Sequence, residues 1–232
     1  MKTPDELTVY RTIGQQYAST LGGFRDAIRP GVTEKELASV ATFGWLQAGG
    51  EDIAQLNVCS AHNMNPWHRW PTERSLQEGD LVGIDLHGRG PNGLRGDAST
   101  TFFVGDRAPS DVRDRYRAAY EYLQGAISAF RAGRSITEAA AAVPPVPERY
   151  RAQQYNYNVA HGIGMGSSGY PQLDPKRKPI DDVLQANQVL AVECYFGEVG
   201  SPRAVKLEEQ IVVRDGEPEI LGPIPVEDRF LS

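Results

Sequence analysis

Two aspartates flank a glycine-rich segment in the middle of the chain. The sequence GIDLHGRGPNGLRGDAST begins at Gly83 and carries Asp85 and Asp97 near its two ends. Residues 79–86 and 98–104 are rich in β-branched and aromatic side chains bounded by glycines, which predicts a strand on each side of a turn. Carboxylates brought together on facing strands repel each other, so they must either take up protons or share a cation.

The second half of the chain repeats this pattern. The segment NQVLAVEC at 187–194 matches GDLVGIDL at 79–86, with Glu193 in the place of Asp85, and a second acid, Glu208, follows. The helix-start patterns before the two segments also match, which indicates two related halves, although chance alignment of two α+β segments is the alternative. If the halves are related, each supplies two carboxylates to one site.

His161, in the glycine-rich segment AHGIGMG, is the candidate fifth metal ligand beside the four acids. Two divalent ions would balance the four carboxylates, and oxygen ligands with one imidazole suit Mn²⁺, Fe²⁺, Co²⁺ or Zn²⁺. The spacing alone fits a second interpretation equally well, in which the histidine is a satisfied core residue and the acids are unrelated surface groups.

Amphipathic helices are expected before each pair of strands. Thr3–Glu6 and Thr33–Glu36 have the capping-box pattern, and apolar residues follow at helical spacing up to Arg29–Gly31 and Gly49–Gly50. A third long helix should end near Arg131–Gly133, and a short alanine-rich helix should follow Ser135.

Composition narrows the class of protein. The 232 residues carry a formal net charge of −6 without any basic run, which argues against nucleic acid or an anionic membrane as partner. No apolar run approaches the roughly 20 residues of a membrane span, and the N-terminus has no signal-peptide pattern. We therefore expect a cytoplasmic protein with a peptide or small-molecule substrate, with a homodimer as one arrangement open to it.

Three sequence blocks in order, GDLVGIDL…GDASTTFFVG, AHGIGMG and LAVECYFGEVG…VKLEEQIVV, resemble the pita-bread metallopeptidase family. This family includes methionine aminopeptidase, aminopeptidase P, prolidase, creatinase and a dimethylsulfoniopropionate lyase, and the chain is most similar to the creatinase, prolidase and lyase branch. The resemblance implies an α+β pita-bread fold of two pseudo-symmetric halves, with a curved antiparallel sheet and outer helices. It further implies one catalytic domain over residues 1–232, without the N-terminal domain of the creatinase-like relatives.

The resemblance also implies a dinuclear metal site with a defined set of ligands. These would be Asp85, Asp97, His161, Glu193 and Glu208. The expected activity is hydrolysis of a peptide or small amide C–N bond, as in Xaa-Pro peptidases. Two divalent ions (Mn, Fe, Co or Zn) would activate the attacking water. Glu193 would accept the proton.

Two further histidines are candidate catalytic residues. His68 lies where aminopeptidase P-like members place a substrate-contacting histidine, unless it is simply a surface residue. His87 follows Asp85 by two positions, so strand alternation points both to the same face. A histidine at this position departs from the family pattern. His87 would be an added metal ligand, a proton carrier or a substrate contact, unless it lies past the end of the strand and faces solvent.

Ser167 and Ser168 are a larger departure from the family pattern. The peptidases usually carry a second histidine where this chain has Ser168, and the lyase carries its proposed base, an aspartate, where this chain has Ser167. Two alternatives to the hydrolase therefore stay open. One is a metal-dependent lyase acting on a small carboxylate, and the other is a binding module without activity.

Overall fold

The computed structural model of the chain describes residues 1–68, 70–152, 159–166, 169–173 and 181–231. In these residues the sheet strands are β1 Asp52–Ser60, β2 Leu81–Arg89, β3 Ala98–Phe103, β4 Ala160–Gly162, β5 Gly169–Leu173, β6 Val189–Gly197, β7 Ala204–Val212 and β8 Glu219–Ile220. They form one antiparallel sheet in the order β1-β2-β3-β7-β6-β4-β5, with β8 paired to β7.

The helices are α1 Pro4–Ala27, α2 Glu34–Gln47, α3 Ser110–Ala129, α4 Ile136–Ala142 and α5 Glu148–Arg151. Capping boxes open α1, α2 and α4, because the Thr3, Thr33 and Ser135 side chains accept from the backbone three residues on. The glutamate three residues on accepts a hydrogen bond from the backbone N–H of the capping residue. Two otherwise unpaired N–H groups are therefore satisfied at the start of each of these helices. None of the described helices combines the length and apolar character needed to cross a bilayer.

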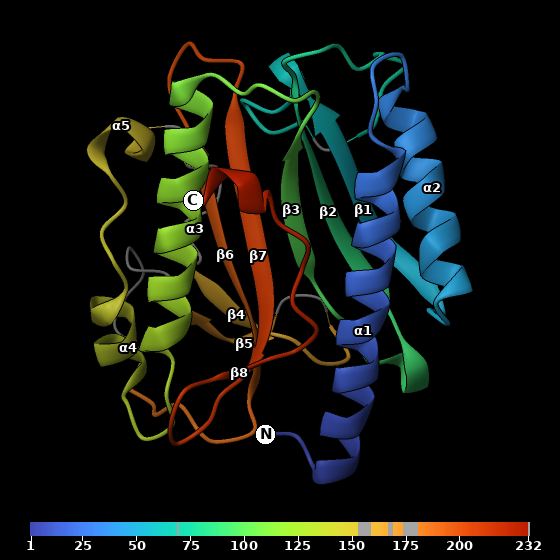
Figure 1. Cartoon of the computed structure of the whole chain (residues 1–232). Helices are drawn as coiled ribbons and strands as arrows, with labels where there is room; N and C mark the ends of the chain where they lie inside the picture. The colour runs from blue at the N-terminus through green and yellow to red at the C-terminus, as the bar shows by residue number, and fades with distance from the viewer. Residues whose placement is uncertain (69, 153–158, 167–168, 174–180, 232) are drawn as a thin grey trace.

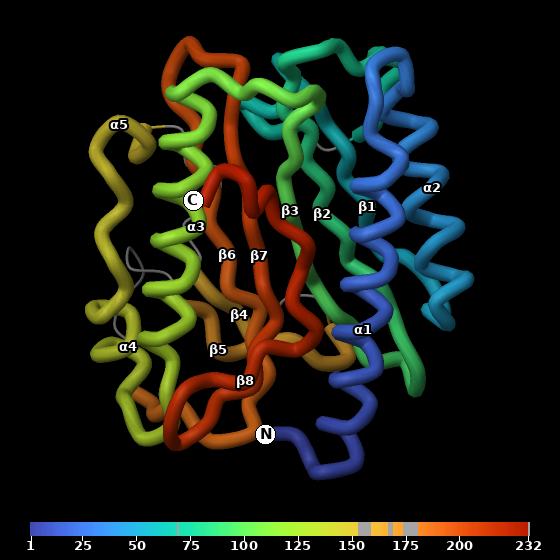
Figure 2. Tube along the Cα trace, in the orientation of Figure 1, coloured from blue at the N-terminus to red at the C-terminus, as the bar shows by residue number. Residues whose placement is uncertain are grey.

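The long helices lie along one face of the sheet, as Figures 1 and 2 show. Helices α1 and α2 cover the half formed by β1, β2 and β3, and α3 covers β6 and β7. The two halves meet in the middle of the sheet, where β3 pairs with β7 through Ser99 and Glu208. The arrangement agrees with two related halves that join along these central strands.

Each half has its own hydrophobic core beneath its helices. Tyr17, Phe24 and Trp45 belong to the core under α1 and α2, and Tyr116 and Phe196 belong to the core under α3. Alternation along the strands sends every second side chain into these cores. The intervening positions therefore face the opposite side of the sheet, where the site lies.

Two element boundaries differ from the sequence-based expectation. Helix α1 ends at Ala27, just short of the proline-glycine stop. Strand β2 continues to Arg89 rather than ending at Leu86, because β1, which the sequence analysis did not predict, pairs with it from Ser60 as far as Asp52. The extension places His87 inside a strand and excludes the interpretation that it lies past the strand end.

Candidate metal centre

One row of directly paired residues crosses the sheet and carries three of the acids. Asp85 on β2 pairs with Ser99 on β3, Ser99 pairs with Glu208 on β7, and Glu208 pairs with Glu193 on β6. Directly opposed residues in an antiparallel sheet point to the same face. The strand register therefore brings the carboxylates from the two halves together at the seam between them.

The serine in this row bridges the two halves. Ser99 Oγ lies 2.9 Å from Asp85 Oδ1 and 2.6 Å from Glu208 Oε2. Its hydroxyl carries one proton, so it donates to one of these carboxylates at a time. The other carboxylate then needs a cation or a different donor.

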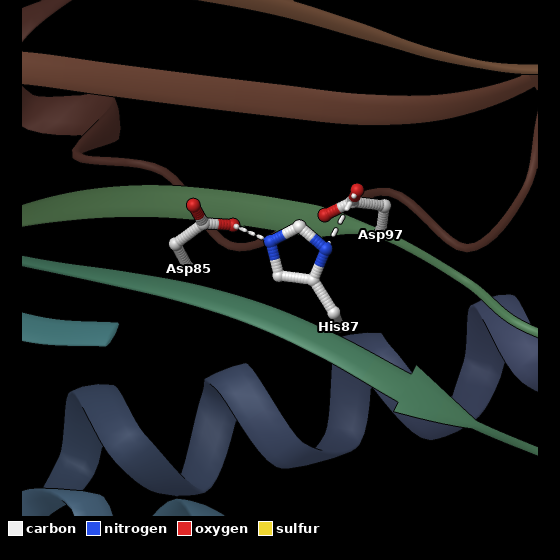
Figure 3. Close-up of side chains that lie close together, drawn as sticks. All are labelled: Asp85, His87 and Asp97. Atoms are coloured by element: carbon white, nitrogen blue, oxygen red, sulfur yellow. Dashed lines mark ion pairs between the residues drawn. The ribbon is translucent and has the colours of Figure 1, made fainter. Parts of the chain in front are cut away.

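Asp97 and His87 lie at the end of the β2–β3 hairpin. Ala98 pairs with Leu86, so Asp97 adjoins the position of His87. Figure 3 shows the His87 ring between the two aspartates, with Nδ1 3.0 Å from Asp97 Oδ2 and Nε2 3.4 Å from Asp85 Oδ1. The Tyr17 hydroxyl on α1 fixes this part of β2, because it donates to Leu86 O and accepts from Gly88 N.

His161 enters the site from β4. It pairs with Ala191 on β6, next to the row that contains Glu193. The neighbouring Gly162 has no room for a side chain, because a Cβ there would lie 2.1 Å from Tyr170 O. The glycine thus allows β5 to pack closely on β4 beside His161.

The His161 imidazole faces three acids through Nε2. This atom lies 3.6 Å from Asp97 Oδ2, 3.8 Å from Glu208 Oε1 and 3.9 Å from Glu193 Oε1. Two ligand atoms that each lie about 2.1 Å from the same ion are roughly 3–3.5 Å apart. A small inward shift of these side chains would therefore let His161 and the neighbouring carboxylates bind one ion.

A lysine that the sequence analysis did not single out lies among the acids. Lys206 Nζ is 2.8 Å from Glu208 Oε2, 3.3 Å from Asp85 Oδ2 and 3.3 Å from Glu193 Oε2, and the side chain is 1% exposed. It precedes Glu208 by two positions on β7, so strand alternation was the signal that would have placed it on the same face.

Burial and neighbouring charges move the pKa values of Asp85, Asp97 and Glu193 away from the ordinary range. Burial and the charge of Glu208 raise the pKa of Asp97, and burial together with Glu208 and Asp85 raises that of Glu193 despite the opposing effect of Lys206. Burial would also raise the pKa of Asp85, but Lys206 and His87 hold it below its usual value. Burial lowers the pKa of His87, yet the charges of Asp97 and Asp85 outweigh it and raise that pKa.

The donor set fits divalent metal ions. Asp97 Oδ1 is buried and has no hydrogen-bond partner among the described residues, which is costly for a carboxylate unless a cation binds it. Two groups of side chains in the described part of the chain have the spacing of metal ligands. One is Asp85, His87 and Asp97, and the other is Asp97, His161 and Glu208.

The structure therefore brings together six of the residues that the sequence singled out. They are Asp85, His87, Asp97, His161, Glu193 and Glu208. His68 differs, because it is exposed on the segment between β1 and β2, and its backbone N–H donates to Asn63 O. Ser167 and Ser168 lie outside the described residues.

Comparison with known families gives one match across most of the chain. The sequence profile of metallopeptidase family M24 matches residues 9–215. This range includes the four acids, His87, His161 and Lys206.

Curated relatives include members of two enzyme groups. Dimethylsulfoniopropionate lyase DddP of Roseovarius nubinhibens is 27% identical over 243 residues, which cover 100% of this chain and 54% of the lyase. Methionine aminopeptidase 1 of Bacillus subtilis is 27% identical over 202 residues, which cover 83% of this chain and 79% of that protein. The chain thus spans about half the length of the lyase.

Solved structures confirm the fold. Prolidase from Pyrococcus furiosus superposes with a TM-score of 0.86 at 20% identity, covering 97% of this chain and 66% of that one. The prolidase from Pyrococcus horikoshii OT3 superposes with a TM-score of 0.87 at 19% identity, covering 98% of this chain and 64% of that one. The expected α+β pita-bread fold is therefore correct.

Proposed function

Because the chain belongs to metallopeptidase family M24, we propose that it is a dinuclear metal-dependent hydrolase of a peptide or small amide C–N bond. The observation that carries the proposal is the convergence of four buried carboxylates and His161 from both halves of the sheet. When bound, two divalent ions would polarise the substrate carbonyl and activate water for attack on it. Mn²⁺, Fe²⁺, Co²⁺ and Zn²⁺ all suit these ligands.

Glu193 is our candidate for the group that accepts the proton from the attacking water. It is buried beside His161, with Oε1 3.9 Å from Nε2. Burial and the charge of Glu208 raise its pKa, which brings a carboxyl group closer to the range in which it both takes up and releases a proton near neutral pH. The nearby Lys206 limits this shift and keeps the charged form accessible.

The two further candidate catalytic histidines, His68 and His87, have different surroundings. His68 is exposed, so it can meet a substrate that enters from solvent, and we propose that it donates a hydrogen bond near the scissile bond. His87 lies between two metal-ligand candidates, so it acts inside the site.

A lyase is the second candidate, because the similarity to the dimethylsulfoniopropionate lyase covers the whole chain. In that case a base would remove a proton next to a bound carboxylate while a leaving group departs. Product mass separates the two activities, since hydrolysis adds the elements of water and elimination adds nothing. The sequence lacks the lyase's proposed base at Ser167 and the peptidases' second histidine at Ser168, so the match to the metallopeptidase family is why we place hydrolysis first.

The test is an assay of metal-free and metal-loaded protein against a panel of dipeptides, Xaa-Pro peptides and small amides, with dimethylsulfoniopropionate added for the lyase. We expect turnover only with metal, and a loss of roughly 10²-fold or more in Glu193→Gln. Exposed Glu121→Gln is the matched control and should keep full activity. Full turnover by chelator-treated protein would contradict the proposal, and a chain that binds no metal would support a binding module.

Two further expectations from the sequence, a cytoplasmic location and a homodimer, stay predictions.

A further inference from the structure

Two arginines at the end of the β2–β3 hairpin have no role in the proposed hydrolysis. Arg89 is the last residue of β2, and Arg95 pairs with it directly across the hairpin. Directly opposed residues in an antiparallel pair have Cβ atoms about 5 Å apart, and like charges at such positions destabilise the pair. A negatively charged group bound between the two guanidinium groups would remove this repulsion.

Both arginines lie on the face of the sheet that carries the candidate metal ligands. Arg89 follows His87 by two positions, and Arg95 precedes Asp97 by two. Alternation along an extended chain sends residues two apart to the same side. The arginines therefore share the face on which Figure 3 shows His87 and Asp97.

The glycines next to the arginines confirm this direction. A Cβ at Gly88 would lie 2.5 Å from the Trp45 ring, and a Cβ at Gly96 would lie 2.4 Å from the Tyr17 ring. Both aromatic rings belong to the hydrophobic core under α1 and α2. Because these glycines face the core, the adjacent arginines face the opposite side, where the metal centre lies.

The protein supplies little negative charge to the two arginines. Arg89 Nε lies 3.4 Å from Asp52 Oδ1, and the two side chains are 36% and 50% exposed, so this ion pair is weak. In the described part of the chain, no other acid lies within ion-pair distance of either arginine. The Nε atoms of Arg89 and Arg95 are buried and have no hydrogen-bond partner among the described residues.

The hairpin end also contacts the segment that follows His161. Arg95 N donates a hydrogen bond to Gly164 O at 2.8 Å, so the arginines lie near the part of the centre formed by Asp97 and His161. Two residues of a strand span about 7 Å, and each residue of an extended peptide spans about 3.5 Å. A substrate with its scissile bond at the metal centre would therefore reach the arginines with a group one or two residues away.

We propose that Arg89 and Arg95 bind a carboxylate of the substrate, so that the chain acts on compounds with a free carboxylate one or two residues from the scissile bond. The inference rests on the proposed hydrolase function and names its substrate class. A guanidinium donates two parallel N–H groups to the two oxygens of a carboxylate, whereas an ammonium group offers only a point charge.

The test compares each compound of the peptide and amide panel as the free acid and as the C-terminal amide, which lacks the negative charge. The metal-loaded proteins are wild type, Arg89→Gln, Arg95→Gln and the conservative Arg89→Lys. Arg113→Gln is the matched control, because Arg113 is exposed on α3. Circular dichroism establishes that each variant is folded.

Binding is measured separately, without turnover. Ligand-observed NMR compares propionate with its neutral analogue propan-1-ol on the same five proteins. This measurement reports on the carboxylate site even if none of the panel compounds is hydrolysed.

We expect the wild type to prefer the free acids. Each Arg→Gln variant should raise KM for the acids by about 10- to 100-fold, since hydrogen bonds to charged groups contribute about that much. The kinetics on the C-terminal amides should stay unchanged, and Arg89→Lys should lie between wild type and Arg89→Gln. Propionate binding should weaken in the two glutamine variants and not in Arg113→Gln.

The outcomes separate the inference from the proposed function. If wild type hydrolyses acids and amides equally well and the glutamine variants keep its KM, the arginines do not recognise the substrate and the inference is wrong, while the hydrolase proposal is unaffected. If no compound is hydrolysed but propionate binding depends on both arginines, the carboxylate site is supported and the hydrolase proposal fails.

Discussion

Lys206 Nζ lies 2.8 Å from Glu208 Oε2, and the two residues are alternate positions on the same strand. The ammonium group also approaches Asp85 and Glu193, so one buried positive charge contacts carboxylates from both halves of the chain. One lysine against four buried acids still leaves an excess of negative charge. The lysine therefore reduces the repulsion within the site without removing the need for metal ions.

Replacing this lysine should make the metal-free protein strongly unstable. Lys206→Met leaves buried carboxylates without their cation, which typically costs about 3–5 kcal/mol in free energy of unfolding. Added Zn²⁺ should recover more stability in the variant than in wild type, because the ions replace the missing positive charge. Urea unfolding with chelator and with Zn²⁺ measures both effects.

The control for this prediction is Lys35→Met. Lys35 pairs with Glu73 on the surface and is 55% exposed, so its loss should cost less than about 1 kcal/mol. A Lys206→Met protein as stable as this control would show that the buried ammonium contributes little.

Removing metal from the wild type should lower its thermal midpoint. An ion present at about 100 times its dissociation constant stabilises the folded state by roughly 2.7 kcal/mol, which corresponds to about 5–10 °C for a chain of this size. Asp97→Ala and Glu208→Ala should lose this metal-dependent shift, whereas exposed Asp215→Ala should retain it. Differential scanning calorimetry with and without chelator gives the comparison, and an unchanged midpoint would argue against bound ions.

Ordinary aminopeptidase and Xaa-Pro substrates should be poor substrates for this chain. Family peptidases usually carry two outer histidines, and here the second is replaced by Ser168. A serine hydroxyl cannot carry positive charge to a developing oxyanion, and loss of one such donor costs about 10²-fold or more in rate. We expect kcat/KM well below about 10⁴ M⁻¹ s⁻¹ on Xaa-Pro dipeptides, and an increase in Ser168→His. Rates above that value in the wild type would show that the replacement is harmless.

The sequence was informative where local patterns decide the structure. The two predicted capping boxes at Thr3 and Thr33 are confirmed, because each motif satisfies its own backbone groups, and the short helix expected after Ser135 begins there with a third. The structure also brings Asp85 and Glu193 into the same row, as the repeat suggested. Their role as metal ligands stays a prediction.

Other features depend on strand pairing that the sequence does not reveal. Alternation places Lys206 on the same face of β7 as Glu208, but the sequence does not show that this face is closed, and the register of β3 against β7 does. Strand β1 escaped prediction because polar residues such as Gln55 and Asn57 interrupt its apolar pattern. The place of His87 inside β2 follows from that unpredicted pairing.

The segment that carries His68 is held by one buried carboxylate at the start of α2. Glu34 Oε1 accepts from Ser60 N at 2.7 Å and Ser60 Oγ at 2.6 Å, and Oε2 accepts from Thr72 N at 2.9 Å and Thr72 Oγ1 at 2.7 Å. These contacts lie on both sides of His68. Burial raises the pKa of Glu34, but the hydrogen bonds from Ser60, Thr72 and Asn63 outweigh it and hold the pKa below its usual value.

Glu34→Gln should therefore destabilise the protein in a way that depends on pH. The amide nitrogen cannot accept these hydrogen bonds, so we expect a loss of roughly 2 kcal/mol or more in free energy of unfolding at neutral pH. Because the folded-state pKa is lowered, the contribution of the carboxylate is complete above the ordinary pKa of about 4.3. It is lost as the pH falls through the folded-state pKa, so wild type and variant should converge in acid.

Urea unfolding of both proteins from neutral to acidic pH measures this convergence, with exposed Glu73→Gln as the control that should differ little from wild type at any pH. If His68 contacts the substrate, Glu34→Gln should also raise KM, because the segment that presents the imidazole is no longer fixed at both ends. A constant difference in stability across the pH range would mean that the shape of the Glu34 side chain, and not its charge, holds the segment in place.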